Sequence, residues 1–235
     1  METIVDEFDF KKYRKEVPHS FTLLCSKRKS GKTFSLTRII YDNFKDVDNF
    51  FVFSTTSDIN GEYAFINKRF HYKVEDAFVV IPKIFERQKQ LKQLNKKKEV
   101  CIIFDDINID TRFSPIGKLI DGIAIKGRHL LITCFVSVQD VRMVSPALHE
   151  NTDLLILFRT NNERLRQVIK EYYLGHKVSK EEKEAILNIN KNIDYVAIII
   201  ANYMNKEENI FWYKADKAPE FKAGNKSQWL LYSDK

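Results

Sequence analysis

The sequence predicts an α/β fold in which helices cover both faces of a mainly parallel central sheet. Short apolar runs of strand length alternate along the chain with longer amphipathic stretches. Runs such as "VCIIFDD" contain no alternating polar residues, as expected of strands that are buried on both faces. Repeated alternation of strand and helix is the signature of a three-layer α/β/α domain.

The first part of the chain contains two expected strands and two expected helices. The apolar run "FTLLC" predicts a strand over 21–25, and apolar residues at helical spacing predict a helix over 33–44. A second strand is expected over 50–56. Residues 57–75 have the composition of a surface connection, and 76–95 have the pattern of a helix that becomes basic toward its end.

The middle of the chain repeats this order. A strand is expected over 100–106, followed by a helix over 115–125 that we expect Gly122 to break. Buried strands are expected over 130–139 and 153–159, where apolar residues dominate. This continues the strand–helix alternation on which the fold class rests.

The last part contains two further expected helices, 161–173 and 179–189. The second of these has a capping box, with Ser179 as N-cap and Glu182 three residues later. The apolar runs 194–200 and 209–215 are expected to form a final hairpin or edge pair.

The chain is expected to form one domain, over 20–215, between an N-terminal extension, 1–19, and a C-terminal tail, 216–235. It has 235 residues, which fits one sizeable domain. The tail lacks a clear hydrophobic period, and neither a repeat nor a Pro-rich or Gly/Ser-rich linker divides the chain.

Composition and charge narrow the function classes. Hydrophobic residues make up 44% and charged residues 30%, which excludes a disordered chain. The net charge of +7 favours an anionic partner, nucleic acid first, although it also serves solubility. The three Cys form no CxxC pair, which indicates a reducing, intracellular compartment. The chain has neither a signal-peptide pattern nor an apolar run of about 20 residues, so we expect a soluble protein without a membrane span.

A near-complete phosphate-binding loop follows the first expected strand. The stretch "CSKRKSGKTF" matches G-x-x-x-x-G-K-[ST], except that Ser26 replaces the first glycine. Backbone amides at a helix start point at phosphate oxygens, Lys32 would reach the β- and γ-phosphates of ATP, and the Thr33 hydroxyl would bind Mg²⁺. The residues expected to hold the nucleotide are Ser26, Lys27, Arg28, Lys29, Ser30, Gly31, Lys32 and Thr33.

Two acids end the strand expected over 100–106. Asp105 is expected to hold Mg²⁺, usually through water, and Asp106 to polarise the attacking water. The alternative is a strand that ends in turn-forming acids, since "DDIN" also suits a turn. A polar strand tip follows at Ser137 and Gln139, where Gln139 would touch the γ-phosphate or orient water, or would only mark the transition to a loop.

These motifs, in this order, resemble the genome-packaging ATPases of large double-stranded DNA viruses. "SKRKSGKT", "IIFDD", "KGRHLLITCFVSVQ" and "NTDLLILFR" carry the resemblance, which covers about residues 20–215. The family includes poxvirus, giant-virus and virophage proteins and belongs to the FtsK–HerA group of P-loop motors. The resemblance implies a P-loop NTPase fold of the RecA/ASCE type, with ATP and Mg²⁺ as cofactors.

The resemblance also implies roles for particular residues. Lys32, Thr33, Asp105, Asp106 and Gln139 match the phosphate, metal, catalytic and sensor positions of the family.

One arginine is implied to act on a neighbouring subunit. Arg128 resembles an arginine finger, with Arg142 as the second candidate and a plain surface arginine as the alternative. Ser26 for Gly and Asp106 for Glu depart from the usual pattern, which bears on the rate of hydrolysis more than on the fold.

The implied assembly is a homo-oligomeric ring of about five or six subunits, since head-to-tail contacts that close form rings. Its implied partners are double-stranded DNA, bound without sequence preference, and capsid proteins. The implied location is the host-cell cytoplasm or the virion. Candidate DNA contacts are Lys68, Arg69, the lysines of 87–98 and those of the C-terminal tail.

Other functions remain open from the sequence. A helicase or plasmid-transfer coupling ATPase shares the fold, and a nucleotide-binding assembly protein with negligible turnover would share the loop. A nucleotide kinase is less favoured, because paired acids at a strand tip suit the activation of water.

Overall fold

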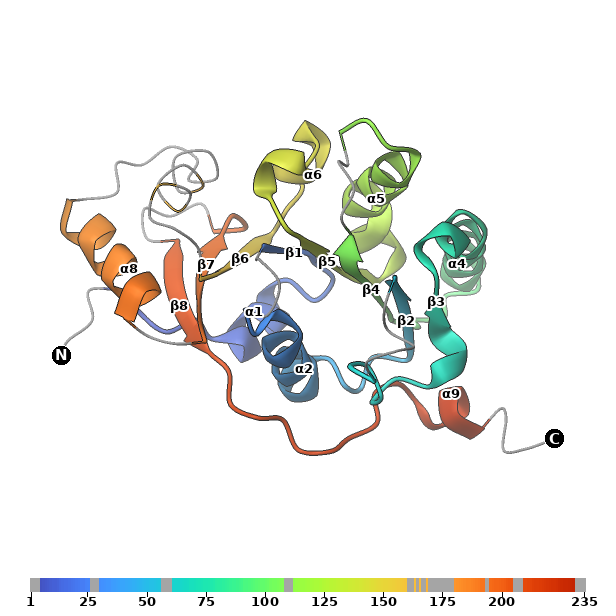
Figure 1. Cartoon of the computed structure of the whole chain (residues 1–235). Helices are drawn as coiled ribbons and strands as arrows, with labels where there is room; N and C mark the ends of the chain where they lie inside the picture. The colour runs from blue at the N-terminus through green and yellow to red at the C-terminus, as the bar shows by residue number, and fades with distance from the viewer. Residues whose placement is uncertain are drawn as a thin grey trace.

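A central sheet organises the chain in the computed structural model, which describes residues 5–25, 30–55, 61–107, 112–159, 163, 165, 168, 180–192, 195–204 and 209–230. The sheet has eight strands in the order β3-β2-β4-β5-β1-β6-β7-β8 (Figure 1). Its strands are β1 (Phe21–Cys25), β2 (Asn49–Ser54), β3 (His71–Tyr72), β4 (Val100–Ile107), β5 (Ile132–Val138), β6 (Leu154–Phe158), β7 (Val196–Ala201) and β8 (Ile210–Lys214).

The direction of the strands confirms the predicted fold class. The strands from β3 to β6 pair in parallel, whereas β6–β7 and β7–β8 are antiparallel. The last two strands therefore form the expected edge pair. In a parallel sheet the carboxyl ends of neighbouring strands meet at one edge, which gathers side chains from distant parts of the sequence there.

Helices cover both faces of the sheet. One face carries α4 (Ala77–Gln93), α5 (Pro115–Lys126) and α6 (Pro146–Glu150), which lie above the sheet in Figure 1. The other face carries α1 (Phe10–Glu16) and α2 (Lys32–Asn43). The remaining elements are α8 (Lys180–Asn192), α9 (Lys226–Leu230) and the 3-10 turns η1 (Lys68–Phe70), η2 (Val74–Asp76), η3 (Gly127–Leu130) and η4 (Val141–Met143).

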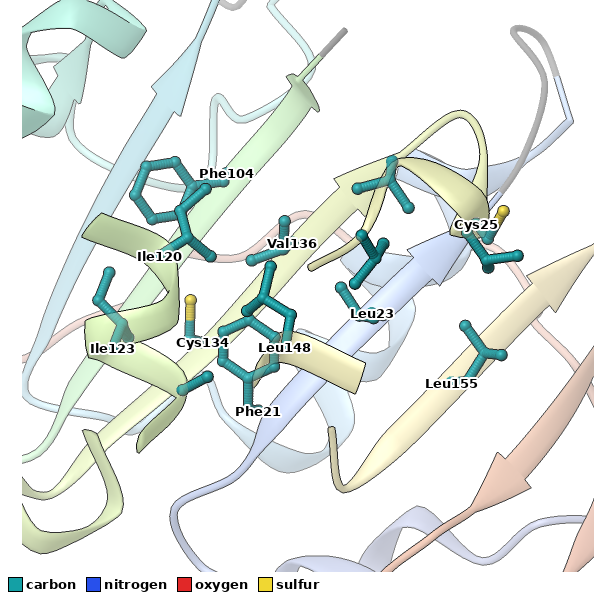
Figure 2. Close-up of a cluster of buried hydrophobic side chains, with 14 of the residues drawn as sticks. Phe21, Leu23, Cys25, Phe104, Ile120, Ile123, Cys134, Val136, Leu148 and Leu155 are labelled. Carbon is teal, nitrogen blue, oxygen red and sulfur yellow. The ribbon is translucent and has the colours of Figure 1, made fainter. Parts of the chain in front are cut away.

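Each face has its own apolar core because successive strand residues point to opposite sides. Figure 2 shows the α4–α6 side, where Phe21 and Leu23 of β1 meet Ile120 of α5 and Leu148 of α6. The α1–α2 side packs Leu36, Ile39 and Ile40 of α2 on the sheet. All three cysteines are buried.

Two local expectations are wrong. The segment 57–75 is not only a surface connection, because its described part buries Tyr63, Phe65 and Ile66 against α2 and the sheet. Gly122 does not break the helix, since α5 continues through it to Lys126. A single helical glycine costs only about 1 kcal/mol, which the buried face of α5 offsets.

Part of the expected helix 161–173 lies outside the described residues. Of that segment, 163, 165 and 168 are described and are helical, and Leu165 and Val168 are buried. The proposed cap Ser179 also lies outside them. The helix that follows, α8, is confirmed from Lys180 onward.

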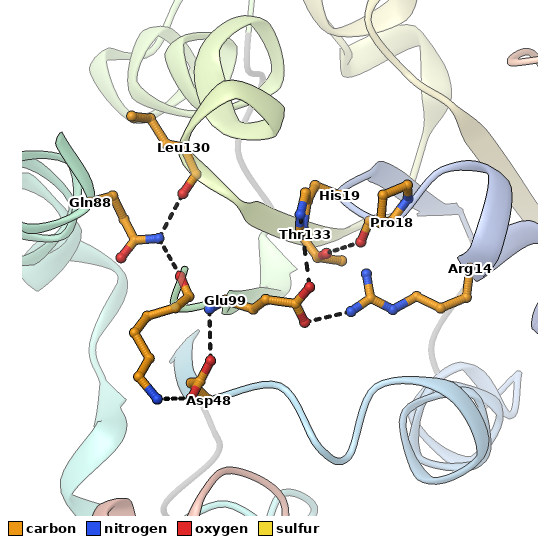
Figure 3. Close-up of polar contacts among 9 residues, drawn as sticks. Arg14, Pro18, His19, Asp48, Gln88, Glu99, Leu130 and Thr133 are labelled. Atoms are coloured by element: carbon orange, nitrogen blue, oxygen red, sulfur yellow. Dashed lines mark hydrogen bonds and ion pairs between the residues drawn. The ribbon is translucent and has the colours of Figure 1, made fainter. Parts of the chain in front are cut away.

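A polar network holds together the amino ends of the strands (Figure 3). Glu99 pairs with Arg14 of α1 at 2.6 Å, and its backbone N–H donates to Asp48 at 2.9 Å. The side-chain amide of Gln88 donates to the backbone carbonyls of Lys98 and Leu130. Burial lowers the pKa of His19 beside them. This edge of the sheet is therefore tied by structural contacts.

Residues before and after the expected domain pack against it. Phe10 and Tyr13 of α1 are buried in the α1–α2 core. Gln228 of α9 is buried, and its side chain bonds both the N–H and the C=O of Phe50 in β2. Among the described residues, no helix combines the length and apolar character that crossing a bilayer requires.

Candidate active site

The start of α2 is built to receive an anion. Gly31 is its N-cap residue with φ +87°, a left-handed conformation that glycine adopts without strain. Gly31 has no side chain that could cap this end, and the first turn contains no acidic residue. Backbone N–H groups and the helix dipole therefore favour a negative charge at this point. The preceding loop residues 26–29 lie outside the described part of the chain.

Lys32 and Asp105, 73 positions apart, meet at this edge. The Lys32 ammonium lies 3.4 Å from an Asp105 carboxylate oxygen, and the two side chains are 13% and 4% exposed. A phosphate-binding site requires the first acid of the β4 pair to lie near the loop lysine, and Asp105 does lie near Lys32. Thr33 follows Lys32 in the first turn of α2 and is half-buried.

A bulge in β4 falls at the two acids. Phe104 pairs with Val136 and Ile107 with Val138, so β4 has one more residue than β5 over this stretch. Bulges re-aim side chains and are common beside active sites. Asp105 is buried opposite Ser54 of β2. For Asp106 only the backbone, within β4, belongs to the described structure.

The polar strand tip lies where the sequence places it. β5 pairs with β1 on one side and β4 on the other, so it runs between the loop strand and the acidic strand. Gln139 directly follows β5, and its carbonyl accepts a weak contact of 3.8 Å from the Cys25 thiol at the end of β1. Gln139 is therefore on the same sheet edge as Lys32 and Asp105.

The two candidate arginines lie at opposite edges. Arg128, in η3 before β5, donates to Asp153 at 3.1 Å, while Asp153 also accepts from the backbone N–H of Phe21. All three residues belong to the amino ends of β5, β6 and β1, away from Lys32. Arg142, in η4 after β5, pairs with Asp140 at 2.7 Å and is 62% exposed.

Sequence reasoning missed one residue of this site, Tyr63. It comes from the segment interpreted as a surface connection, yet it is fully buried. Burial, followed by the nearby Asp105 carboxylate, raises its pKa, while the Thr33 hydroxyl lowers it. No motif marks this tyrosine, because its place depends on how the segment after β2 folds back.

The side chains at this edge fit a nucleotide with Mg²⁺. Thr33 and Asp105 offer hard oxygen donors, which Mg²⁺ prefers. The Ser30 hydroxyl is buried, and the described residues give it no hydrogen-bond partner. An orphan polar atom at the mouth of a phosphate loop suits a phosphate oxygen.

The solved structures that this chain resembles include a viral genome packaging NTPase and a conjugation coupling protein. The genome packaging NTPase B204 of Sulfolobus turreted icosahedral virus 2, solved with ATP-gammaS, superimposes with a TM-score of 0.54 over 84% of this chain and 97% of B204, at 17% identity. The chain has the fold of a P-loop ATPase. The pCW3 conjugation coupling protein TcpA matches this P-loop ATPase fold too, with a TM-score of 0.57 at 13% identity, over 83% of this chain and 60% of that one.

Sequence relatives of this chain include proteins of a mimivirus and of an iridescent virus. An uncharacterized protein of Acanthamoeba polyphaga mimivirus is 24% identical in an alignment of 224 residues that covers 89% of this chain and 76% of the relative. Another, from Invertebrate iridescent virus 3, is 26% identical over 198 residues, 82% of this chain and 74% of the relative. No protein-family model matches the chain. The resemblance to viral packaging ATPases is thus confirmed for the fold.

We expect Gly31→Ala to destabilise the protein by about 1–2 kcal/mol, because an L-residue is strained at this φ. A Cβ here would also lie 3.1 Å from the Tyr195 ring, which would have to move. Urea unfolding measures the change. Gly122→Ala is the matched control: its Cβ meets no heavy atom within 4 Å, so it should stabilise α5 by about 0.5–1 kcal/mol. Equal effects of the two substitutions would contradict the conformational argument.

Proposed function

We propose that this protein is an ATP hydrolase that translocates double-stranded DNA and packages it into a viral capsid. The observation that carries the proposal is the 3.4 Å approach of Lys32 to Asp105 at the start of α2. The fold of the B204 packaging NTPase and the viral origin of the relatives support it.

In the proposed site each residue has one task. Backbone amides of residues 26–33 and the Lys32 ammonium bind the phosphates. Thr33 and Asp105 hold Mg²⁺, which when bound neutralises charge on the phosphate oxygens. Asp106 accepts a proton from the attacking water, and Gln139 orients that water or contacts the γ-phosphate.

The proposed assembly is a homo-oligomeric ring of about five or six subunits around DNA, with capsid proteins as further partners. Its proposed location is the host-cell cytoplasm or the virion. DNA would be held through phosphates by exposed cations. Among the candidates, the stretch from the last turn of α4 to the start of β4 is densest, with Lys92, Lys96, Lys97 and Lys98 all exposed. Lys68 and Arg69 are exposed as well.

Phosphate release with and without double-stranded DNA tests the proposal. We expect DNA to stimulate turnover, and the stimulation to fall steeply between low and high salt, because contacts to DNA phosphates release counterions. Nucleotide binding without turnover at any DNA concentration would favour an assembly protein instead.

A second candidate, a conjugation-type or helicase-type DNA translocase, is favoured by the likeness to the coupling protein TcpA. Unwinding of a forked DNA substrate would support the helicase-type alternative over packaging.

A further inference from the structure

Tyr63 is held firmly in place in the core between α2 and the sheet. Its side chain is 0% exposed, on the α1–α2 side of the sheet. The C-terminal segment fixes the turn that carries Tyr63, because the Ala223 N–H donates to the Phe65 carbonyl at 2.8 Å. The Phe65 ring stacks on Phe221, with centroids 4.7 Å apart. The tyrosine therefore has little freedom to move away from the site.

The Tyr63 hydroxyl is an unsatisfied buried group. Among the described residues, none meets it with hydrogen-bond geometry. Leaving such a group without a partner costs about 1–3 kcal/mol. A phenylalanine would fill the same space without that cost, so packing alone does not explain a tyrosine here.

Two polar groups lie close to this hydroxyl, and both are proposed ligands of the metal. They are the Asp105 carboxylate and the Thr33 hydroxyl. Tyr63 packs in one core with Ile103 of β4 and Leu36 of α2. Asp105 follows Ile103 by two residues, on the same face of β4. Thr33 precedes Leu36 by one helical turn, and both the carboxylate and the hydroxyl affect the pKa of the phenol. The phenol is protonated at neutral pH, because the ordinary pKa of a tyrosine is about 10. It can therefore donate one hydrogen bond and accept another.

We propose that Tyr63 is a positioning residue of the nucleotide site, whose hydroxyl links Thr33 to Asp105. This inference rests on the proposed function. A threonine that binds a metal through an oxygen lone pair must direct its own proton to another acceptor. The Tyr63 oxygen accepts that proton in a hydrogen bond, and the phenol donates to Asp105. This orients the lone pairs of both ligands toward the metal, as outer partners of metal ligands do elsewhere.

Tyr63→Phe tests the link, because it keeps the ring and removes only the hydroxyl. Binding of a fluorescent ATP analogue is measured over a range of Mg²⁺ concentrations and again in EDTA. We expect the Mg²⁺ midpoint, the Mg²⁺ concentration that gives half-maximal binding, to rise at least about tenfold. Binding in EDTA should stay unchanged, because the phosphate loop is intact. The melting temperature should stay equal or rise, since an orphan hydroxyl is lost.

Tyr13→Phe is the matched control. Tyr13 of α1 is also buried at 1% exposure, and the described structure likewise gives its hydroxyl no hydrogen-bond partner. It lies near Ser20 and Asp153, at the opposite edge of the sheet. Removal of the Tyr13 hydroxyl should leave the Mg²⁺ midpoint unchanged.

A double-mutant cycle with Asp105→Asn gives a second measurement. In the Asp105→Asn protein, Tyr63→Phe should shift the Mg²⁺ midpoint by less than about twofold, because the carboxylate ligand that the phenol orients has already been replaced by a neutral amide. An unchanged midpoint in Tyr63→Phe, beside a normal wild-type response to Mg²⁺, would overturn the role of Tyr63 and leave the proposed function standing. A wild-type protein that binds no nucleotide, with or without Mg²⁺, would overturn both.

Discussion

Lys32→Ala should reduce ATP hydrolysis at least about 100-fold, the scale of losing one charged group that stabilises a transition state. In the structure the Lys32 ammonium is nearly buried and lies 3.4 Å from Asp105. This position, in the first turn of α2, would let it contact both a bound phosphate and Asp105, the proposed metal ligand. Phosphate release in the presence of double-stranded DNA measures the loss.

A stability measurement must accompany this variant. Without Lys32, the buried Asp105 carboxylate loses the ammonium that lies 3.4 Å away, which destabilises the fold. The melting temperature is therefore measured with and without Mg-ATP. We expect wild type to be stabilised by the ligand and Lys32→Ala to lose that response. Lys83→Ala, an exposed lysine of α4, is the control and should keep both turnover and the response. Undiminished turnover in Lys32→Ala would refute the site.

The fold could be predicted from the sequence because its strands are almost continuously apolar. The run 21–25 becomes β1 with all five residues buried, and 153–159 becomes β6 in the same way. Such runs are typical of strands that are buried on both faces. The segment after β2 could not be predicted, because its aromatic residues have no period. Their burial depends on contacts with the C-terminal segment, such as Phe65 on Phe221.

The site could be predicted where a motif ties residue types to strand ends. Lys32, Asp105 and Gln139 fall at one edge because β1, β4 and β5 are adjacent and parallel. Tyr63 could not be found in this way, since its role depends on tertiary folding rather than on spacing. The ion pair of Arg128 with Asp153 could not be predicted either, because nothing in "KGRH" indicates Asp153 as the partner.

Arg128→Ala should have two separable effects, of which the larger is on turnover. If Arg128 acts as the finger, hydrolysis should fall about 10³-fold or more while nucleotide binding remains. Mixing Arg128→Ala with Asp106→Ala subunits should then restore part of the activity, because some interfaces would contain both intact groups. No restoration at any ratio would argue against a shared site.

The second effect of Arg128→Ala is on stability, through Asp153. Burial raises the pKa of Asp153, while the Phe21 amide and Arg128 lower it. A carboxyl with a raised folded-state pKa contributes most stability at low pH, and that contribution is lost as the pH rises through the folded pKa. Without Arg128 the folded pKa rises further, so the variant should be less stable at neutral pH. The deficit should shrink as the pH falls through the pKa of Asp153. Urea unfolding at several pH values measures this.

Arg142→Ala separates the two candidate arginines, since Arg142 lies at the carboxyl edge and is mostly exposed. Its pairing with Asp140 spans only two positions, so its loss should cost little stability. Arg142 is the finger if turnover falls in Arg142→Ala and mixing with Asp106→Ala subunits restores it. In that case Arg128→Ala should show only the pH-dependent loss of stability. The reverse pattern assigns the finger to Arg128, and Asp153→Asn then serves as its control. That substitution removes the charge that Arg128 pairs with but keeps the arginine, so turnover should survive it.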